Sequence, residues 1–215
     1  MKHPGHRLIS RVSYWKDFLT KPAPQHFVES KPDWAEASTT IAGCGDGSIL
    51  DSVARSARAV RDGEVAYERD GVVFDRIHYS WPVLSGLLWA AGRNGSTLRV
   101  IDFGGALGSH YYQYKAFRQD LKDVSWALVE QSGMVEIGNR EFANSSLMFF
   151  DTISEATSAV KPHVAMASGS LCYVPDPQGV LEGLAKSNAD VFILDRVPVH
   201  TGLENVLARQ QKGRA

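Results

Sequence analysis

The second half of the chain alternates short apolar runs with longer amphipathic stretches. Each apolar run has the length and the β-branched or aromatic content of a buried strand. These runs cover residues 98–103, 125–129, 146–150, 164–168 and 191–194. The stretches between them carry apolar residues at helical spacing. They cover residues 109–121, 133–142, 153–160 and 176–186. Strands that alternate with helices are typical of βαβ units, so we predict an α/β fold with a mostly parallel, Rossmann-like sheet and helices on both faces.

The first part of the chain has a different pattern. Residues 1–47 contain several prolines and end in glycines, which predicts an irregular segment. Ser48 followed by Asp51 has the form of a capping box and predicts the start of a helix. A second helix is expected over 81–91, where large apolar residues surround most of the circumference and indicate packing on two sides. Residues 66–74 between these helices predict an irregular stretch or a short strand.

These patterns predict three parts along the chain. A helical and irregular segment, 1–95, is expected to pack on a Rossmann-like core formed by 96–200. Residues 201–215 are polar and are expected to form a helix or a tail. A full sheet of this class has two more strands after the fifth. The chain therefore looks shortened at its C-terminal end, which would leave a sheet edge exposed or covered by a partner.

Composition narrows the function classes. The 23 basic and 24 acidic residues nearly cancel, so nothing indicates binding to nucleic acid. No apolar run approaches the ~20 residues that span a membrane, and no secretory signal is seen, which favours a cytoplasmic protein. The two cysteines, Cys44 and Cys172, lack partners at metal spacing and predict free thiols. We expect no metal site among the histidines.

The turn after the first predicted strand carries the candidate chemistry. Asp102 precedes a glycine-rich turn with Gly104, Gly105 and Gly108, and a helix is expected to follow. Such a turn lets the backbone approach a ligand, which the amide groups of the helix N-terminus can also contact. The spacing is not the dinucleotide pattern G-x-G-x-x-G. A carboxylate at position 102 would repel a pyrophosphate but attract the ammonium of an amino acid, which favours S-adenosylmethionine over NAD(P).

Acidic residues also end the next two strands. Glu130 ends the second strand, where an acid can accept hydrogen bonds from both ribose hydroxyls. Asp151 ends the third strand, where it could face the adenine edge. Each acid also has a structural alternative. Asp102 could cap a turn, Glu130 could be a solvated strand end, and Asp151 could be the N-cap of the next helix.

Five blocks of residues together resemble an uncharacterised family of bacterial class I S-adenosylmethionine-dependent methyltransferases. The blocks are Tyr67-Glu68-Arg69-Asp70, Tyr79-Ser80-Trp81-Pro82, Asp102-Phe103-Gly104-Gly105 with Gly108, Val129-Glu130-Gln131, and Asp195-Arg196. The resemblance covers most of the chain. It implies a Rossmann-like methyltransferase fold and a donor site at Asp102, Gly104, Gly108 and Glu130. One departure is Ala106, which occupies the middle glycine position of the common class I pattern.

The sequence therefore predicts a methyltransferase that acts on an unknown small-molecule acceptor, with a sugar as a weak suggestion. If the nucleophile is a hydroxyl, a base must take its proton, and His110 just past the turn is our candidate. A helix-start histidine without a catalytic role is the alternative for that residue. Two other functions stay open: a non-catalytic or truncated methyltransferase-like protein, and an NAD(P)-dependent oxidoreductase.

Overall fold

The computed structural model describes residues 27–29, 34, 47–198 and 208–210 of the 215-residue chain. Contacts divide the chain into two units, which are described separately. In the smaller unit, β1 (Phe27–Glu29) pairs antiparallel with β9 (Ala208–Gln210). The prediction of a helix or tail over 201–215 is wrong at β9. Its strand partner lies near the other end of the sequence, so local periodicity could not reveal it.

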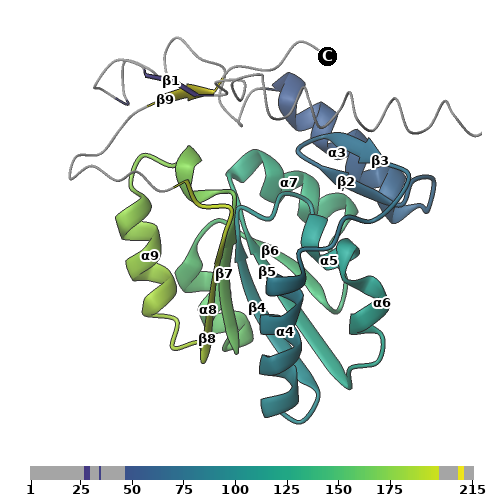
Figure 1. The fold of residues 1–215 in the computed structure, drawn as a ribbon, viewed down its shortest axis with the longest axis vertical. Helices are drawn as coiled ribbons and strands as arrows, with labels where there is room; N and C mark the ends of the chain where they lie inside the picture. The colour runs from purple at the N-terminus through teal and green to yellow at the C-terminus, as the bar shows by residue number, and fades with distance from the viewer. Residues whose placement is uncertain (1–26, 30–33, 35–46, 199–207, 211–215) are drawn as a thin grey trace, which may run out of the picture. The chain divides into compact units, whose positions relative to one another are not determined.

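The larger unit, 42–199, is built on a five-stranded parallel sheet (Figure 1). The strand order is β6-β5-β4-β7-β8, and every neighbouring pair is parallel. The strands are β4 (Thr97–Phe103), β5 (Asp123–Val129), β6 (Leu147–Phe150), β7 (Val164–Ser168) and β8 (Val191–Asp195). All five predicted strands are confirmed, and the Rossmann-like α/β fold is confirmed with them. This order places the first strand of the sheet, β4, at its centre, where the strand order reverses and where ligands bind in open α/β sheets.

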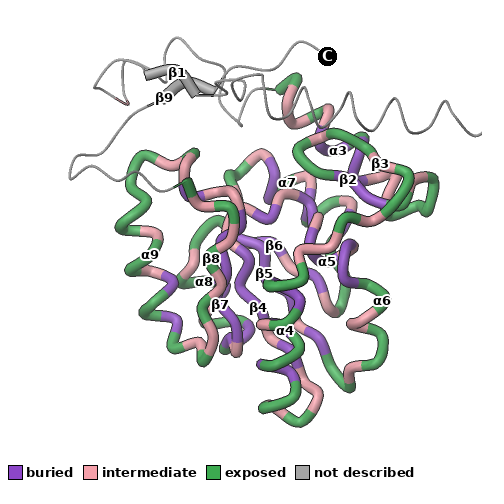
Figure 2. Tube along the Cα trace, in the orientation of Figure 1, coloured by how far each residue is buried: buried purple, intermediate pink, exposed green. Residues whose placement is uncertain are grey.

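Helices cover both faces of this sheet. They are α3 (Gly47–Arg61), α4 (Trp81–Arg93), α5 (Ser109–Gln113), α6 (Lys115–Arg118), α7 (Ser132–Glu141), α8 (Ile153–Val160) and α9 (Pro177–Ala185), with a 3₁₀ turn at Leu171–Tyr173. One apolar core lies between the sheet and α3, α4, α5 and α7. A second core lies between the sheet and α8 and α9. Strands β4 to β7 are mostly buried between these layers (Figure 2), as near-continuous apolar runs require.

Alternation along β4 and β5 decides which side chains face which layer. Val100 and Trp126 belong to the core under α3, α4, α5 and α7, whereas Ile101 and Ala127 belong to the core under α8 and α9. Side chains two residues apart on a strand share a face. Asp102 and Glu130 therefore lie on the α5 side of the sheet, near its carboxyl edge.

Three helix predictions need correction. The single helix expected over 109–121 is two short helices, α5 and α6, separated at Tyr114. The first helix begins at Gly47, so Ser48 lies inside α3 and is not its N-cap. Helix α4 does not pack on two sides, since Leu88 is 40% exposed and Trp89 is 56% exposed. The apolar residues around the circumference of α4 predicted burial on two sides, but no described residue covers the second side.

A hairpin covers the N-terminus of α5. Strands β2 (Tyr67–Arg69) and β3 (Val72–Phe74) pair antiparallel, and the two turn residues, Asp70 and Gly71, both have positive φ. Such a two-residue turn matches the twist of paired strands, and glycine relieves its strain. The hairpin packs on both α3 and α5. The Ser56 hydroxyl on α3 donates to the Gly71 carbonyl at 2.7 Å, which fixes the turn.

The edge strand β8 pairs with β7 and with no other strand of the described chain. Its Phe192 and Leu194 are 47% and 52% exposed. The residues that the structure describes add no further strand to this sheet. None of the described helices is long and apolar enough to cross a membrane.

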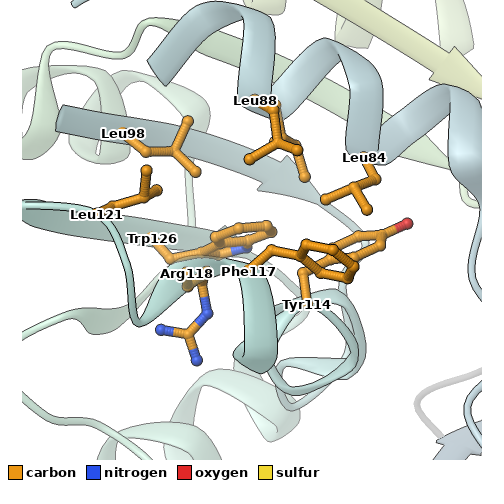
Figure 3. Close-up of a pocket in the computed structure, with 9 residues that line it drawn as sticks. Leu84, Leu88, Leu98, Tyr114, Phe117, Arg118, Leu121 and Trp126 are labelled. Carbon is orange, nitrogen blue, oxygen red and sulfur yellow. The ribbon is translucent and has the colours of Figure 1, made fainter. Parts of the chain in front are cut away.

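An apolar pocket lies between α4, the α5–α6 segment and strands β4 and β5 (Figure 3). Its lining residues are Leu84, Leu87, Leu88, Leu98, Tyr114, Phe117, Arg118, Leu121 and Trp126. The cavity is about 10 Å³, which is room for about one water molecule. We assign this pocket to core packing, because it is too small for a nucleoside ligand.

An ion pair between α3 and α7 makes the stability of the larger unit sensitive to acid. Arg58 Nε donates to Glu141 Oε2 at 2.6 Å, and hydrogen bonds from Arg58 and Arg140 lower the Glu141 pKa to about 2. A carboxyl group with a depressed pKa stabilises the fold above its unfolded pKa, about 4.3. That contribution is lost as the pH falls toward 2.

We therefore expect Glu141→Gln to lower the free energy of unfolding by about 1 kcal/mol at pH 7, because the pair is partly exposed. The difference from wild type should shrink between pH 4.5 and pH 2. Urea unfolding across this pH range measures it. Glu136→Gln is the control, since its pair with Arg140 spans 3.6 Å and is more exposed. A difference that persists unchanged at low pH would contradict the ion-pair explanation.

Candidate functional site

The glycine-rich turn between β4 and α5 has a backbone that few sequences can adopt. Gly104, Ala106 and Gly108 have φ values of 72°, 53° and 103°. The Gly104 amide donates to the Val129 carbonyl at the end of β5. A Cβ on Gly104 would lie 2.2 Å from the Cβ of Ser170, in the loop after β7. The turn is therefore held between the carboxyl ends of its two neighbouring strands.

Asp102 lies directly beneath this turn and is fully buried, with 0% exposure. Its Oδ2 accepts hydrogen bonds from His110 Nδ1 at 3.1 Å and from Trp126 Nε1 at 3.2 Å. Its Oδ1 is buried and has no partner among the described residues. Gly105 packs against the carboxylate so closely that a Cβ there would lie 2.6 Å from Oδ2. The turn therefore packs on a buried carboxylate, one oxygen of which lacks a hydrogen-bond partner in the described chain.

The Asp102 contact also orients His110. A carboxylate can only accept, so the imidazole donates from Nδ1 and its neutral form carries the lone pair on Nε2. His110 is 7% exposed and its ring stacks on Tyr114. Within the described chain, Nε2 has no hydrogen-bond partner. Asp102 therefore fixes the ring so that Nε2 is the accepting nitrogen, and no described residue bonds to it.

Glu130 is tied to the turn and is not a freely solvated strand end. Its Oε1 accepts from the Ala106 amide at 2.9 Å, and its Oε2 accepts from the Gln131 amide at 3.1 Å. Burial raises the pKa of Glu130, the two amides lower it, and the negative charge of Asp102 raises it. Each oxygen retains a further lone pair for a ligand hydroxyl.

Asp151 follows β6 and is exposed. It is not the N-cap of α8. That position belongs to Thr152, whose hydroxyl accepts from the Glu155 amide while the Glu155 carboxylate accepts from the Thr152 amide. The alternative prediction, that Asp151 is the N-cap of this helix, is therefore wrong by one residue. Strand pairing puts Val129 opposite Phe150, so Asp151 follows β6 beside the end of β5, where Glu130 lies.

A second polar cluster lies at the carboxyl ends of β7 and β8. The Ser168 hydroxyl donates to Asp195 Oδ2 at 2.7 Å, and Arg196 Nη2 donates to the Ser168 carbonyl at 3.2 Å. The sequence indicated Asp195 and Arg196 but not their contact with Ser168. These groups form hydrogen bonds with one another, so fewer of their donors and acceptors remain for a ligand. Asp102, by contrast, has one oxygen without a partner in the described chain.

Two polar residues near α5 are buried, which the sequence pattern did not predict. Glu68 on β2 is 3% exposed, and its Oε1 accepts from the Ser109 hydroxyl. Gln113 on α5 is 4% exposed, and its Nε2 donates to the His78 carbonyl at 2.5 Å. Glu68 stands in a charged run that resembles a surface turn, and only its alternation with Arg69 along a strand could have suggested burial.

The described residues give little support for a metal site or for a cysteine nucleophile. Among the described residues, no group of three or more His, Cys, Asp or Glu side chains could hold a metal ion. Cys172 is a free thiol, and burial raises its pKa, so it is a poor nucleophile. Cys44 lies outside the described residues.

Comparisons with known proteins assign neither a family nor a function to the chain. No protein family matches the sequence, and no curated protein is significantly similar to it. Among solved structures, the chain is similar to the N-terminal domain of EvdMO1, determined with SAH and D-fucose. The identity is 14%, the TM-score is 0.37, and the match covers 64% of this chain and 61% of that one. It is also similar to the bifunctional kinase-methyltransferase WbdD, with 16% identity, a TM-score of 0.38, and 67% and 34% of the two chains covered. At these values the function has to be argued from the residues.

Proposed function

We propose that the chain is an S-adenosylmethionine-dependent methyltransferase acting on a small-molecule acceptor. The observation that carries this proposal is the unsatisfied Oδ1 of Asp102, a fully buried carboxylate oxygen beside a glycine-rich turn. A buried carboxylate oxygen without a partner is costly and favours a ligand that brings a hydrogen-bond donor, best a cationic one. A pyrophosphate at this position would bring negative charge instead, which argues against NAD(P).

The residues present fit such a donor. Asp102 would hold the ammonium of its amino-acid end, while Gly104, Gly105 and Gly108 let the backbone come close. Glu130 would accept from the ribose hydroxyls, since each oxygen has a free lone pair beyond its amide contact. Asp151, at the next strand end, would face the adenine.

Methyl transfer asks mainly for positioning and exclusion of water, because bound S-adenosylmethionine supplies a methyl group already activated by the sulfonium. His110 is proposed as the base for a hydroxyl acceptor. Asp102 fixes its tautomer, and Nε2 is left to accept the proton from the attacking oxygen. A sugar hydroxyl is one acceptor consistent with this arrangement.

Isothermal titration of the purified full chain with S-adenosylmethionine and, separately, with NADH tests the proposal. We expect dissociation constants in the micromolar range for the methyl donor and no heat with NADH. Donor binding without transfer to any acceptor in a sugar and phenol screen would favour the non-catalytic alternative, for which the exposed β8 edge is the structural reason. Heat with NADH alone would replace the proposal by an oxidoreductase.

A further inference from the structure

Glu68 is a buried carboxylate without a cation beside it. Its Oε2 has no hydrogen-bond partner in the described chain, and no arginine, lysine or histidine there forms an ion pair with it. The neighbouring Arg69 instead lies over the Phe74 ring and 4.0 Å from Asp70. Burial raises the pKa of Glu68, whereas the Ser109 hydroxyl and the Gly71 amide lower it.

Glu68 is anchored to the same helix turn as Asp102. Ser109, which donates to Glu68, follows Gly108 of the glycine-rich turn directly. The next residue, His110, donates to Asp102. Consecutive residues at the start of α5 thus hold two buried carboxylates, each with one unsatisfied oxygen. One carboxylate comes from the centre of the sheet and the other from the hairpin that covers the helix.

The chemistry of the unsatisfied atoms limits what could bind. Three buried side-chain atoms in the described chain lack partners: Glu68 Oε2, Asp102 Oδ1 and Gln113 Oε1. The Gln113 amide cannot simply turn over, because its nitrogen already donates to the His78 carbonyl. Ser109 and Gln113 are four residues apart and share a face of α5. All three atoms are acceptors, so a group that binds to any of them must donate a hydrogen bond, and a phosphate or carboxylate placed directly against Glu68 or Asp102 would be repelled.

We infer that Glu68 is a specificity-determining residue that binds the α-ammonium group of the methyl donor from the hairpin side, opposite Asp102. This inference rests on the proposed function. An ammonium carries a full positive charge and three N–H donors, which is what two carboxylates with one free oxygen each can bind. A bound water would supply donors but no charge, so it would leave the buried carboxylates uncompensated. Glu68 thereby selects a donor that retains its amino-acid end.

Calorimetric titration with two probes tests this inference in the full chain. S-adenosylhomocysteine carries the ammonium but no sulfonium, and methylthioadenosine lacks the whole amino-acid end. The variant is Glu68→Gln, which keeps the shape and an oxygen for Ser109. The control is Glu64→Gln, at an exposed position just before the same hairpin. We expect Glu68→Gln to weaken S-adenosylhomocysteine roughly ten- to hundredfold, the value of a charge-assisted hydrogen bond. Its effect on methylthioadenosine should be less than about twofold, within ordinary scatter.

The outcomes distinguish failure of the inference about Glu68 from failure of the proposed function. Unchanged S-adenosylhomocysteine affinity in Glu68→Gln overturns the inference and leaves the donor site standing. Equal weakening of both probes also overturns it, because Glu68 would then act only through the hairpin structure. If the wild-type chain binds neither probe, the proposed function itself is rejected. Circular dichroism melting of both variants verifies that they fold.

Discussion

Asp102→Asn should lower the affinity for S-adenosylmethionine roughly hundredfold while leaving the fold intact. The asparagine oxygen can still accept from His110 and Trp126, so the contacts that tie β4 to α5 and β5 remain. Its amide nitrogen would then stand where Oδ1 is now unsatisfied and would present donors to the ammonium. Loss of the charge-assisted hydrogen bond accounts for about 1.5–3 kcal/mol, or roughly ten- to hundredfold, and the opposed donors add to it.

Titration calorimetry together with thermal melting measures this effect. The control is His110→Ala, which removes one hydrogen bond to Asp102 but keeps the carboxylate. It should bind the donor within a few-fold of wild type and lose methyl transfer once an acceptor has been identified. If Asp102→Asn binds the donor as tightly as wild type, Asp102 serves only to cap the turn and to hold β4, β5 and α5 together. Unchanged turnover in His110→Ala would remove that residue from the mechanism.

Gly104→Ala should destabilise the larger unit by about 2–5 kcal/mol. The φ of 72° at this position costs an alanine about 1–2 kcal/mol. The new Cβ would also lie 2.2 Å from Ser170 Cβ, and such overpacking costs a further 1–3 kcal/mol unless the loop shifts. A shift would break the hydrogen bond from Ser170 Oγ to the Phe103 carbonyl at 2.7 Å. Denaturant unfolding measures the loss.

Gly95→Ala is the matched control for this substitution. Gly95 has a φ of 63°, and a Cβ there would meet nothing within 4 Å. It therefore reports the backbone strain alone, about 1–2 kcal/mol. Replacing Ser170 by glycine in the Gly104→Ala background should recover most of the excess. Equal losses for Gly104→Ala and Gly95→Ala would mean that the close approach to the β7 loop contributes nothing.

The strands and most helices could be predicted because each buried strand is a continuous apolar run bounded by polar turns. The elements that were missed depend on contacts distant in sequence. β9 is a strand only through its pairing with β1, and the break at Tyr114 follows from packing that helical periodicity does not record. Within the candidate site, the nearness of Asp102 and Glu130 could be predicted because strand ends of a parallel sheet meet at one edge. Their hydrogen-bond partners could not.

Glu68 illustrates what sequence reasoning lacks. The run Tyr67-Glu68-Arg69-Asp70 has the composition of a surface turn, and burial of its second residue is decided by how the hairpin lies on α5. The same limit applies to Asp151. The position of Asp151 at a strand end was predicted. Which of Asp151 and Thr152 caps α8 depends on a shift of one residue in the backbone, which the sequence does not reveal.

The shortness of α5 has a consequence for local opening of the native state. A helix of five residues forms few internal hydrogen bonds, and isolated helices of this length do not persist in water. Its order depends on Glu68, Asp102 and the His78 carbonyl, which form hydrogen bonds with the side chains at positions 109, 110 and 113. Amide hydrogens in α5 should therefore exchange with solvent through small fluctuations, while those of β4, paired on both sides, should exchange only when the whole unit opens. A ligand bound at this turn would therefore contact the stable strand β4 on one side. On the other side it would contact α5, and its binding would help to order that helix.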